Sequence, residues 1–358
     1  MKYTFEISIA GCETECAHCY VSGGRAPAIQ FDDYTKAMTK LKTILDKIDK
    51  EIFVTLGNEV FTHQRISDII IFTYDLMPLY FSYEDFDIPT TGITFGRRTD
   101  IKKVIKALRT ANCSGFGLTL HGGKENHNWI TRNNTSFDSI KTSAEMICNE
   151  GFNVTFNLML SKFLVSDWPS VCEIIGCFPK TDVRLTIPLY LPIDRLRIFQ
   201  QYRAEYDDCM KLEGRLADAR INELDFINKI LENNEKRICK NLLGGGHIDY
   251  KEEYEKTPEW AFFNITQSFD IYYGNVGLHT QLIGNLMRDS SESLHEKIIS
   301  LPKNYDWSAF YNLDKLPPIQ SVLQKITPLK TNYVYPSSTE CFYSWLDGIG
   351  IPSTLLTQ

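Results

Sequence analysis

Strand-like and helix-like segments alternate along the first half of the chain, and this alternation most restricts the folds that it can adopt. Apolar residues recur with a period near two in the strand segments and near 3.6 in the helix segments. Parallel neighbouring strands need a crossover helix between them, so the alternation predicts a parallel sheet. The predicted strands span residues 3–9, 51–56, 87–91, 115–120, 153–160 and 183–189, and the predicted helices span residues 32–48, 64–79, 100–110, 137–150 and 167–176.

Polar residues at alternate strand positions distinguish an open, doubly wound sheet from a barrel-like curl. Strands that helices cover on both faces are almost continuously apolar, whereas a polar inner face suits a cavity that holds a polar ligand. The sequence therefore predicts an α/β fold with a partial, TIM-like (β/α)6 barrel, whose active site lies at the C-terminal ends of the strands. The alternating polar residues are Thr4, Glu6, Ser8, Thr119, His121, Thr155, Asn157, Arg184 and Thr186.

Composition and charge exclude several classes of protein. The chain has 358 residues and a net charge of −7, which argues against a nucleic-acid or anionic-membrane surface. No apolar run approaches the roughly 20 residues of a membrane span, and Glu6 interrupts the only stretch that resembles an export signal. Seven of the ten cysteines are scattered without a disulfide-like framework. We therefore expect a cytoplasmic protein with no membrane or nucleic-acid partner.

The other three cysteines, Cys12, Cys16 and Cys19, lie within eight positions directly after the first predicted strand. A tetrahedral zinc site, or an iron–sulfur cluster held entirely by protein, needs four ligands. Three thiolates leave one iron of a cluster without a protein ligand, and that iron can bind a substrate or cofactor. The alternatives are a zinc site completed by His18 or by a distant residue, and three unrelated thiols.

The stretch "CETECAHCY" resembles the C-x3-C-x-aromatic-C motif of the radical S-adenosylmethionine (radical SAM) superfamily. The resemblance implies that Cys12, Cys16 and Cys19 hold a [4Fe–4S] cluster whose fourth iron is chelated by SAM. It places His18 near the adenine of SAM and adds Tyr20 to the cofactor-binding residues. Members of the family cleave SAM reductively to a 5′-deoxyadenosyl radical, which abstracts hydrogen from the substrate. The electron would come from an external donor such as flavodoxin or ferredoxin.

The segment "TLGNEVF" after the second strand resembles the family's Gly-Gly-Glu-Pro motif. This resemblance implies that Gly57, Asn58 and Glu59 meet the ammonium group of SAM. Asn58 and Val60 replace the second glycine and the proline, but the carboxylate that pairs with the ammonium is retained.

Further cofactor-binding residues are expected at the ends of the later strands. "TTG" at 90–92 resembles the family's Thr-Asn-Gly, which adds Thr91 to the set, and Thr119 and Asn157 stand on polar strand positions. Asn157 occupies the place where a polar residue of the fifth strand often meets the SAM ribose. Arg184 is expected to clamp the SAM carboxylate or a substrate anion, the alternative being an ion pair with Glu6.

The C-terminal half is expected to form two further parts, a helical linker over residues 201–246 and an α+β domain over 247–358. The segment from Phe269 to Ile298 resembles the SPASM/twitch extension, with strands on both sides of a turn at Gly274 and Asn275. Typical members carry cysteines just after this turn, but residues 277–280 contain none. The resemblance therefore implies a SPASM-like scaffold without an obvious auxiliary cluster.

These features predict a radical SAM enzyme, with a ribosomally made peptide as the favoured substrate. A small natural-product precursor, such as a sugar or an amino acid, is the first alternative, because the chain begins almost at the first strand and leaves no room there for a peptide-recognition domain. A zinc-binding protein without catalysis and an iron–sulfur redox carrier are the others. His121, at the end of the fourth strand, and Cys341, a possible hydrogen-atom donor, are the candidate catalytic residues.

Overall fold

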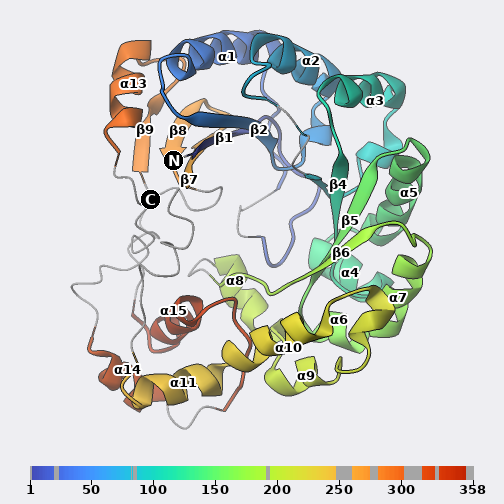
Figure 1. Ribbon diagram of the computed structural model, residues 1–358, viewed down its shortest axis with the longest axis vertical. Helices are drawn as coiled ribbons and strands as arrows, with labels where there is room; N and C mark the ends of the chain where they lie inside the picture. Colours follow the sequence, from blue (N-terminus) through green and yellow to red (C-terminus); the bar gives the residue numbers. More distant parts are fainter. Residues whose placement is uncertain are drawn as a thin grey trace.

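The computed structural model describes most of the chain, coloured along the sequence in Figure 1. The first half follows the predicted alternation, with ends that differ from the predicted ones by a few residues. The described residues are 2–19, 24–81, 83, 87–190, 194–246, 260–274, 281–301, 317–326 and 330–351. The strands of this half are β1 (Lys2–Ser8), β2 (Glu51–Gly57), β3 (Asp87–Thr90), β4 (Gly115–Leu120), β5 (Asn153–Met159) and β6 (Asp182–Thr186). Its helices are α1 (Phe31–Leu45), α2 (Ile66–Leu76), α3 (Ile101–Thr110), α4 (Lys124–Thr131), α5 (Ser136–Asn149), α6 (Lys162–Ser166) and α7 (Trp168–Gly176).

The parallel strands form two sheets that curve around one interior (Figure 1). β3, β4, β5 and β6 are neighbours in that order, and all three of their pairings are parallel. β1 and β2 pair in parallel in the other sheet. At the junction between β2 and β3 a single parallel bridge, Val54 to Phe81, joins the segments in place of a ladder. The arrangement is an incomplete barrel, as the sequence predicted.

Three strands of the C-terminal half extend the sheet that contains β1 and β2. They are β7 (Trp260–Ile265), β8 (Asp270–Tyr273) and β9 (Gln281–Asn285). β7 was not predicted; it lies parallel to β1 on the side opposite β2, and the rings of Phe5 and Phe263 stack with centroids 4.5 Å apart. β8 pairs antiparallel with β7 on one side and with β9 on the other. A tight turn joins β7 to β8. Of the predicted turn, Gly274 is described, whereas Asn275 and the positions 277–280 lie outside the described residues.

The strands bury apolar side chains on their outer face and present polar ones inward. Phe5, Phe156 and Leu158 belong to the main core and have no exposed surface. Polar positions fall on the other face, and the parallel registers place Thr119, Asn157 and Arg184 in one row across β4, β5 and β6. The polar inner face that the sequence predicted is thus present in the structure.

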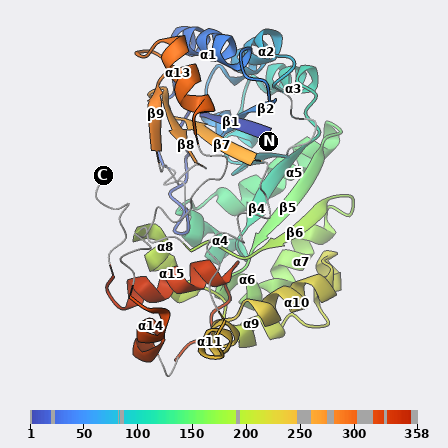
Figure 2. The ribbon, with the colours of Figure 1, turned by 60° about the vertical axis from the view of Figure 1, so that its left-hand side comes forward.

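A second apolar cluster lies among the helices that follow β6 (Figure 2). Arg203, 2% exposed, ties this part to the end of β6 because it donates hydrogen bonds to the backbone oxygens of Pro188 and Val334 at 2.7 and 3.0 Å. The division of the chain at residues 200 and 246 stays a prediction. The helices of this half are α8 (Asp194–Phe199), α9 (Tyr206–Met210), α10 (Glu223–Glu232), α11 (Glu235–Leu243), α13 (Ser291–Ile299), α14 (Ile319–Ile326) and α15 (Ser338–Gly348). Within the described part of the chain, no helix has the length and apolar character needed to cross a bilayer.

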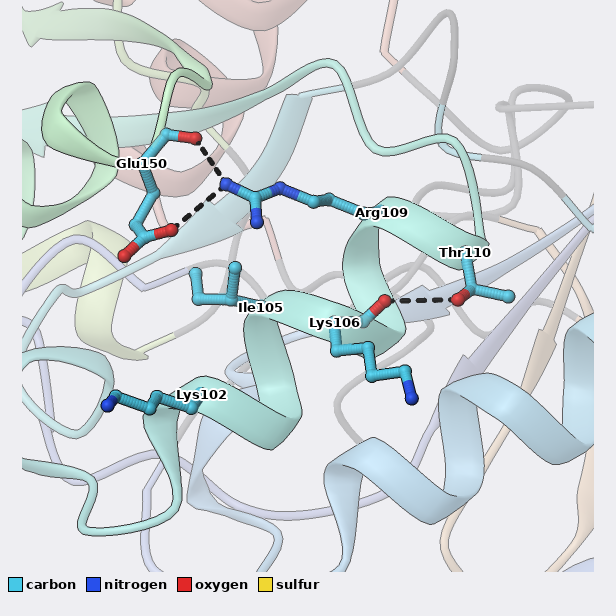
Figure 3. A pocket seen from close by; sticks show the side chains of 6 residues that line it. All are labelled: Lys102, Ile105, Lys106, Arg109, Thr110 and Glu150. Atoms are coloured by element: carbon cyan, nitrogen blue, oxygen red, sulfur yellow. Dashed lines mark hydrogen bonds and ion pairs between the residues drawn. The ribbon is translucent and has the colours of Figure 1, made fainter.

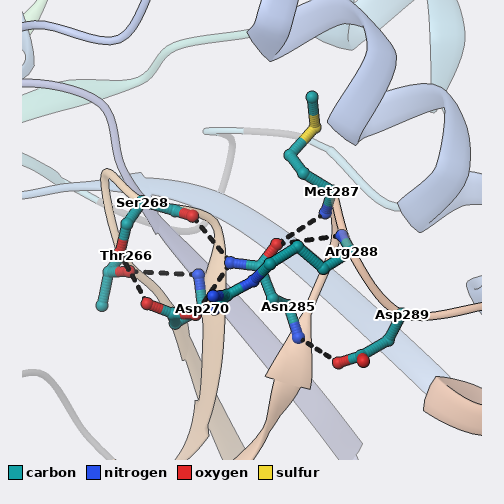
Figure 4. Close-up of polar contacts among 7 residues, drawn as sticks. All are labelled: Thr266, Ser268, Asp270, Asn285, Met287, Arg288 and Asp289. Carbon is teal, nitrogen blue, oxygen red and sulfur yellow. Dashed lines mark hydrogen bonds and ion pairs between the residues drawn. The ribbon is translucent and has the colours of Figure 1, made fainter.

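Asn285 organises the end of β9 (Figure 4). Its side-chain amide donates to the Ser268 carbonyl oxygen at 2.8 Å and to Asp270 Oδ1 at 2.7 Å. Its Oδ1 accepts from the backbone N–H groups of Met287 at 2.8 Å and Arg288 at 3.1 Å. Because the residue is buried, all these bonds would be lost without full replacement by water.

We expect Asn285→Ala to lower the free energy of unfolding by about 2–4 kcal/mol, since buried groups are left unpaired. Urea unfolding followed by tryptophan fluorescence measures this change. Ser268→Ala is the matched control, because it removes an exposed hydroxyl of the same network that bonds Asp270, and should cost below about 1 kcal/mol. Equal effects of the two substitutions would contradict an organising role for Asn285.

Candidate metal and cofactor site

The loop after β1 carries the three clustered cysteines and is pinned by backbone contacts. The Cys12 N–H donates to the Gly24 oxygen at 2.8 Å, and the Ala17 N–H donates to the Ile130 oxygen at 2.8 Å. A Cβ atom on Gly11 would lie 2.3 Å from the Ala26 nitrogen, so only glycine permits this close approach of the two loop arms. The loop therefore holds its thiols at the C-terminal end of β1, where the barrel prediction places the active site.

The three thiols lie in one electrostatic neighbourhood with Glu59. Burial first, then the negative charge of Glu59 and the neighbouring Cys16, raises the pKa of Cys12 to about 12. Burial first, then Cys19, raises the pKa of Cys16 to about 11. The Thr14 hydroxyl lies 3.0 Å from Cys12 Sγ and accepts from Cys16 Sγ at 3.4 Å. Without a bound cation the Cys12 and Cys16 thiols are protonated, and a metal centre would displace their protons.

Buried polar atoms without a hydrogen-bond partner show that this site suits a bound polar group. They include both carboxylate oxygens of Glu13 and the Nδ1 atoms of His18 and His121. Such atoms are rare in folded proteins unless a ligand or water completes them. Three soft thiol ligands next to these unpaired atoms fit an iron–sulfur cluster and a polar cofactor. In the described residues, no three His, Cys, Asp or Glu side chains converge as a single metal ion would require.

Glu59 lies at the junction of the ends of β1, β2 and β3. The side chain is 4% exposed, and both of its oxygens accept from the Thr90 hydroxyl, at 2.9 and 3.0 Å. The Thr91 backbone N–H donates to the same carboxylate. Burial first, and then the negative charge of Glu13, raises the pKa of Glu59 to about 7. A ligand cation would therefore find a fixed carboxylate there and would favour its ionised form.

Gly57 and Asn58 shape the turn before Glu59. Asn58 adopts a φ of 63°, and its side-chain amide donates to Ser8 Oγ at 2.7 Å, which ties this turn to β1. A Cβ atom on Gly57 would lie 2.1 Å from Glu6 Oε1 and 2.4 Å from Glu6 Cγ. The side chain of Glu6 thus occupies the space that any larger residue at position 57 would need.

We expect Gly57→Ala to destabilise the protein by about 1–3 kcal/mol, because the new methyl group forces Glu6 to move. Urea unfolding measures the loss. Gly176→Ala is the control, since a Cβ there meets nothing within 4 Å, and it should be neutral or stabilising by up to about 1 kcal/mol. Glu6→Ala should relieve much of the cost of Gly57→Ala in the double variant. Full additivity would count against the proposed clash.

Three histidine rings form a row from the cysteine loop to α4. The ring centroids of His18 and His121 are 4.4 Å apart, and those of His121 and His127 are 5.2 Å apart. His127 Nδ1 accepts the backbone N–H of His121 at 3.3 Å, so its Nε2 carries the proton and donates to Ser136 at 2.9 Å. Burial lowers the pKa of His18 to about 4 and that of His127 to about 3, and it lowers the pKa of His121 in the same direction. All three rings are neutral at neutral pH.

Local sequence patterns do not identify Glu6, Glu13, His127 or Asn264 as site residues. His127 was the easiest to find, because it follows His121 by six residues in the segment after the fourth strand. In the sequence Glu6 is a polar strand position, a charge that interrupts the N-terminal apolar stretch and the alternative partner of Arg184. Asn264 belongs to the unpredicted strand β7.

Of the three remaining predicted residues, the structure describes two. Arg184 forms an ion pair with Asp87 at 3.4 Å, so the suggested pairing with Glu6 is wrong, and its side chain is 64% exposed. Cys341 has no exposed surface and lies in the second apolar cluster near Cys239, so the structure does not bring its thiol to the cysteine loop. Tyr20 lies outside the described residues.

A surface cavity of about 520 Å³ lies away from these residues, along α3 (Figure 3). Arg109 Nη2 donates there to the Glu150 backbone oxygen at 2.8 Å and to Glu150 Oε2 at 2.9 Å. No predicted site residue lines this cavity, so it is not part of the candidate site. The lining residues are Lys102, Ile105, Lys106, Arg109, Thr110 and Glu150.

Comparisons with known proteins agree with this arrangement. Residues 7–167 match the family model described as the radical SAM superfamily. The chain is similar in fold to anSMEcpe with bound AdoMet and the Cp18Cys peptide, with 13% identity, a TM-score of 0.53, and coverage of 97% of this chain and 96% of that one. It is also similar to Streptococcus suis SuiB bound to the precursor peptide SuiA, with 12% identity, a TM-score of 0.50, and coverage of 83% and 66%. No curated protein matches the chain in sequence.

Proposed function

Residues 7–167 place this enzyme in the radical SAM superfamily, and from this premise we propose that it modifies a ribosomally made peptide. The family uses a [4Fe–4S] cluster and SAM. The observation that carries the proposal is the likeness in fold over 97% of the chain to anSMEcpe, which is described with AdoMet and a peptide bound. SuiB, described with its precursor peptide, supports the same substrate class.

We assign the cluster to Cys12, Cys16 and Cys19. When bound, the cluster and SAM supply the reductive cleavage of SAM and the abstraction of a hydrogen atom from the substrate. The chain would hold the thiolates on the pinned loop and present the Glu59 carboxylate, oriented by Thr90, to the ammonium of SAM. Since His18 is half-buried and neutral, it offers an uncharged ring to the adenine.

The inner face of the barrel supplies the remaining contacts. Thr91 lies beside Glu59, and Thr119 and Asn157 form part of one polar row across β4 and β5, so we assign these residues to the SAM nucleoside and carboxylate. Arg184 ends that row and stays largely exposed, which leaves it available to a substrate anion. His121, buried with an unpaired Nδ1, is assigned to the substrate side of the site.

The test is an anaerobic assay that distinguishes a peptide from a small molecule. The protein is co-expressed with each short open reading frame adjacent to its gene, and the peptide products are analysed by mass spectrometry. A mass change that depends on Cys16 would support peptide modification. If no peptide changes, while sugars or amino acids increase 5′-deoxyadenosine formation, the substrate would instead be a small natural-product precursor.

The electron donor and the compartment follow from the same chemistry. The proposed cluster must be reduced by an external donor, and we assign this role to a flavodoxin or ferredoxin. All ten cysteines lie among the described residues and none forms a disulfide. This suits a reducing compartment, so we propose that the enzyme acts in the cytoplasm.

A further inference from the structure

The pairing of β7 with β1 creates a row of polar residues that the assigned cluster and SAM contacts do not use. The registers align Thr55 of β2, Glu6 of β1 and Asn264 of β7. Paired residues of parallel neighbours point to the same face of a sheet, and adjacent strands are about 4.8 Å apart. We call Thr55, Glu6 and Asn264 the β1 row. It presents a hydroxyl, a carboxyl and an amide together on the inner face.

Unpaired polar groups in the β1 row and in the row next to it indicate a ligand. Asn264 is 2% exposed, and its Nδ2 has no hydrogen-bond partner. Thr4, two residues before Glu6 on the same face, is 7% exposed and its Oγ1 is also unpaired. Leaving buried donors and acceptors unpaired destabilises a fold, because their hydrogen bonds to water are lost without replacement. Two such groups on neighbouring strands indicate a binding site that is complete only when occupied.

Glu6 determines the charge that this site accepts. Among the described residues the half-buried Glu6 carboxylate has no ion pair or hydrogen bond. The only cation of β1, Lys2, pairs with Glu51 at 3.1 Å. Burial raises the pKa of Glu6 to about 7. A nearby positive charge would lower this pKa again, because it favours the ionised carboxylate. An anionic ligand would be repelled, whereas a cationic one would supply the missing counter-charge.

The row also lies next to the assigned SAM contacts. The Glu6 side chain packs against Gly57, the residue that precedes Asn58 and Glu59 in the chain. A group bound by Glu6 would therefore sit beside the end of β2, on the inner face of the barrel. Aromatic residues flank Thr4 in the next row, Phe53 on β2 and Phe262 on β7. Aromatic rings next to a carboxylate are typical of sites for protonated amines.

We propose that Glu6, Asn264 and Thr4 form a substrate subsite that binds a cationic group, which in a peptide substrate is a lysine or arginine side chain near the modified residue. This inference rests on the proposed peptide substrate. Glu6 pairs with the cation, and Asn264 and Thr4 complete its hydrogen bonds. Glu6 acts here as a specificity-determining residue for the substrate and takes no part in holding the cluster.

The first test examines the subsite without a peptide. The cluster-loaded protein is heated at pH 8, where Glu6 is largely ionised, with n-butylammonium chloride or with n-butanol. Butylammonium should raise the melting temperature of the wild type more than butanol does, and Glu6→Gln should remove the difference. Glu51→Gln is the matched control, since Glu51 begins the neighbouring strand and pairs with Lys2 at the surface, and it should behave as the wild type.

The second test uses two labelled pentapeptides, Ac-Gly-Gly-Lys-Gly-Gly-NH2 and its norleucine counterpart, in equilibrium dialysis. The wild type should bind the lysine peptide at least about tenfold more tightly, as expected for a partly buried ion pair of about 1.4 kcal/mol or more. Glu6→Gln should reduce this preference to about onefold. The ratio of affinities does not depend on the fraction of folded protein, so a loss of stability would not imitate the result.

The outcomes separate the subsite from the peptide assignment. A butylammonium effect without binding of either peptide would retain the cation subsite and overturn the peptide substrate. Equal binding of both peptides, or a lysine preference that survives Glu6→Gln, would overturn the subsite and leave peptide modification intact. No butylammonium effect and no peptide binding would overturn both.

Discussion

Cys16→Ala is expected to abolish SAM cleavage, with a loss of 5′-deoxyadenosine of about 10³-fold or more. Cys16 is the central thiol of the loop, because its sulfur shares Thr14 with Cys12 and lies in the field of Cys19. Its removal leaves two thiols for a cluster that already lacks a fourth protein ligand. The measurement is anaerobic: iron and sulfide reconstitution, addition of SAM and dithionite, and chromatography of the products.

Cys177→Ala is the control for this experiment. Cys177 follows α7 and is exposed, and its thiol donates to the Glu173 backbone oxygen at 3.4 Å. Its replacement should leave iron content and product formation unchanged. If wild-type protein with a full cluster yields no 5′-deoxyadenosine, SAM binding decides the matter, because some members of the family cleave SAM only with substrate present. If the cluster-loaded wild type neither forms 5′-deoxyadenosine nor binds SAM, the assignment of residues 12–19 is overturned.

Much of the first half of the fold followed from local patterns in the sequence. The six parallel strands were predicted because each has its own apolar and polar periodicity and a predicted helix separates each strand from the next. β7 was missed because its pairing with β1 joins segments more than 250 positions apart, and no local signal reports such a contact. The turn before β8 was missed for a different reason: Phe269 adopts a φ of 66°, where a sequence-based prediction expects glycine or asparagine.

The site divides in the same way between motif and packing. The cysteines and Glu59 could be found because their spacing along the chain is itself the signal. Asn264 could not, since its relation to Glu6 exists only through the register of β1 and β7. Arg184 shows the same limit: Glu6 and Asp87 are both acidic, and only the order of the strands decides which of them it pairs with.

Glu59→Gln is expected to weaken SAM binding by about 30-fold or more at pH 8. Removing one partner of a buried, hydrogen-bonded charge pair costs about 2 kcal/mol or more, which corresponds to this factor. Thr90 and Thr91 keep the side chain in place, so the substitution removes charge with little change of shape. Isothermal titration of the cluster-loaded protein with SAM measures the loss. Glu15→Gln, in the cysteine loop after β1 but exposed and 3.9 Å from Arg132, should bind SAM as the wild type does.

The pH dependence of binding tests the same carboxylate independently. The pKa of Glu59 is raised to about 7, mainly by burial, and the SAM ammonium pairs with the ionised form. Between pH 8 and pH 6 the ionised fraction falls from about nine-tenths to about one-tenth, so wild-type affinity should fall about tenfold relative to Glu59→Gln. A constant ratio of the two affinities across this range would show that Glu59 does not titrate in the site.

Unfolding of the protein without SAM should show the opposite trend with pH. A carboxyl whose pKa is raised in the folded state keeps a proton that the unfolded chain has lost, so its stabilisation is complete below about pH 4.5 and disappears as the pH rises through about 7. Relative to Glu59→Gln, the wild type should therefore lose about 2–3 kcal/mol over this range. His18 and His127 have lowered pKa values and destabilise the fold below about pH 6.5. The wild type and Glu59→Gln share these histidines, so their effect cancels when the stabilities of the two proteins are subtracted. SAM thus binds best at high pH, where the ionised Glu59 destabilises the protein without SAM most. The ammonium group of SAM then supplies the counter-charge that Glu59 otherwise lacks.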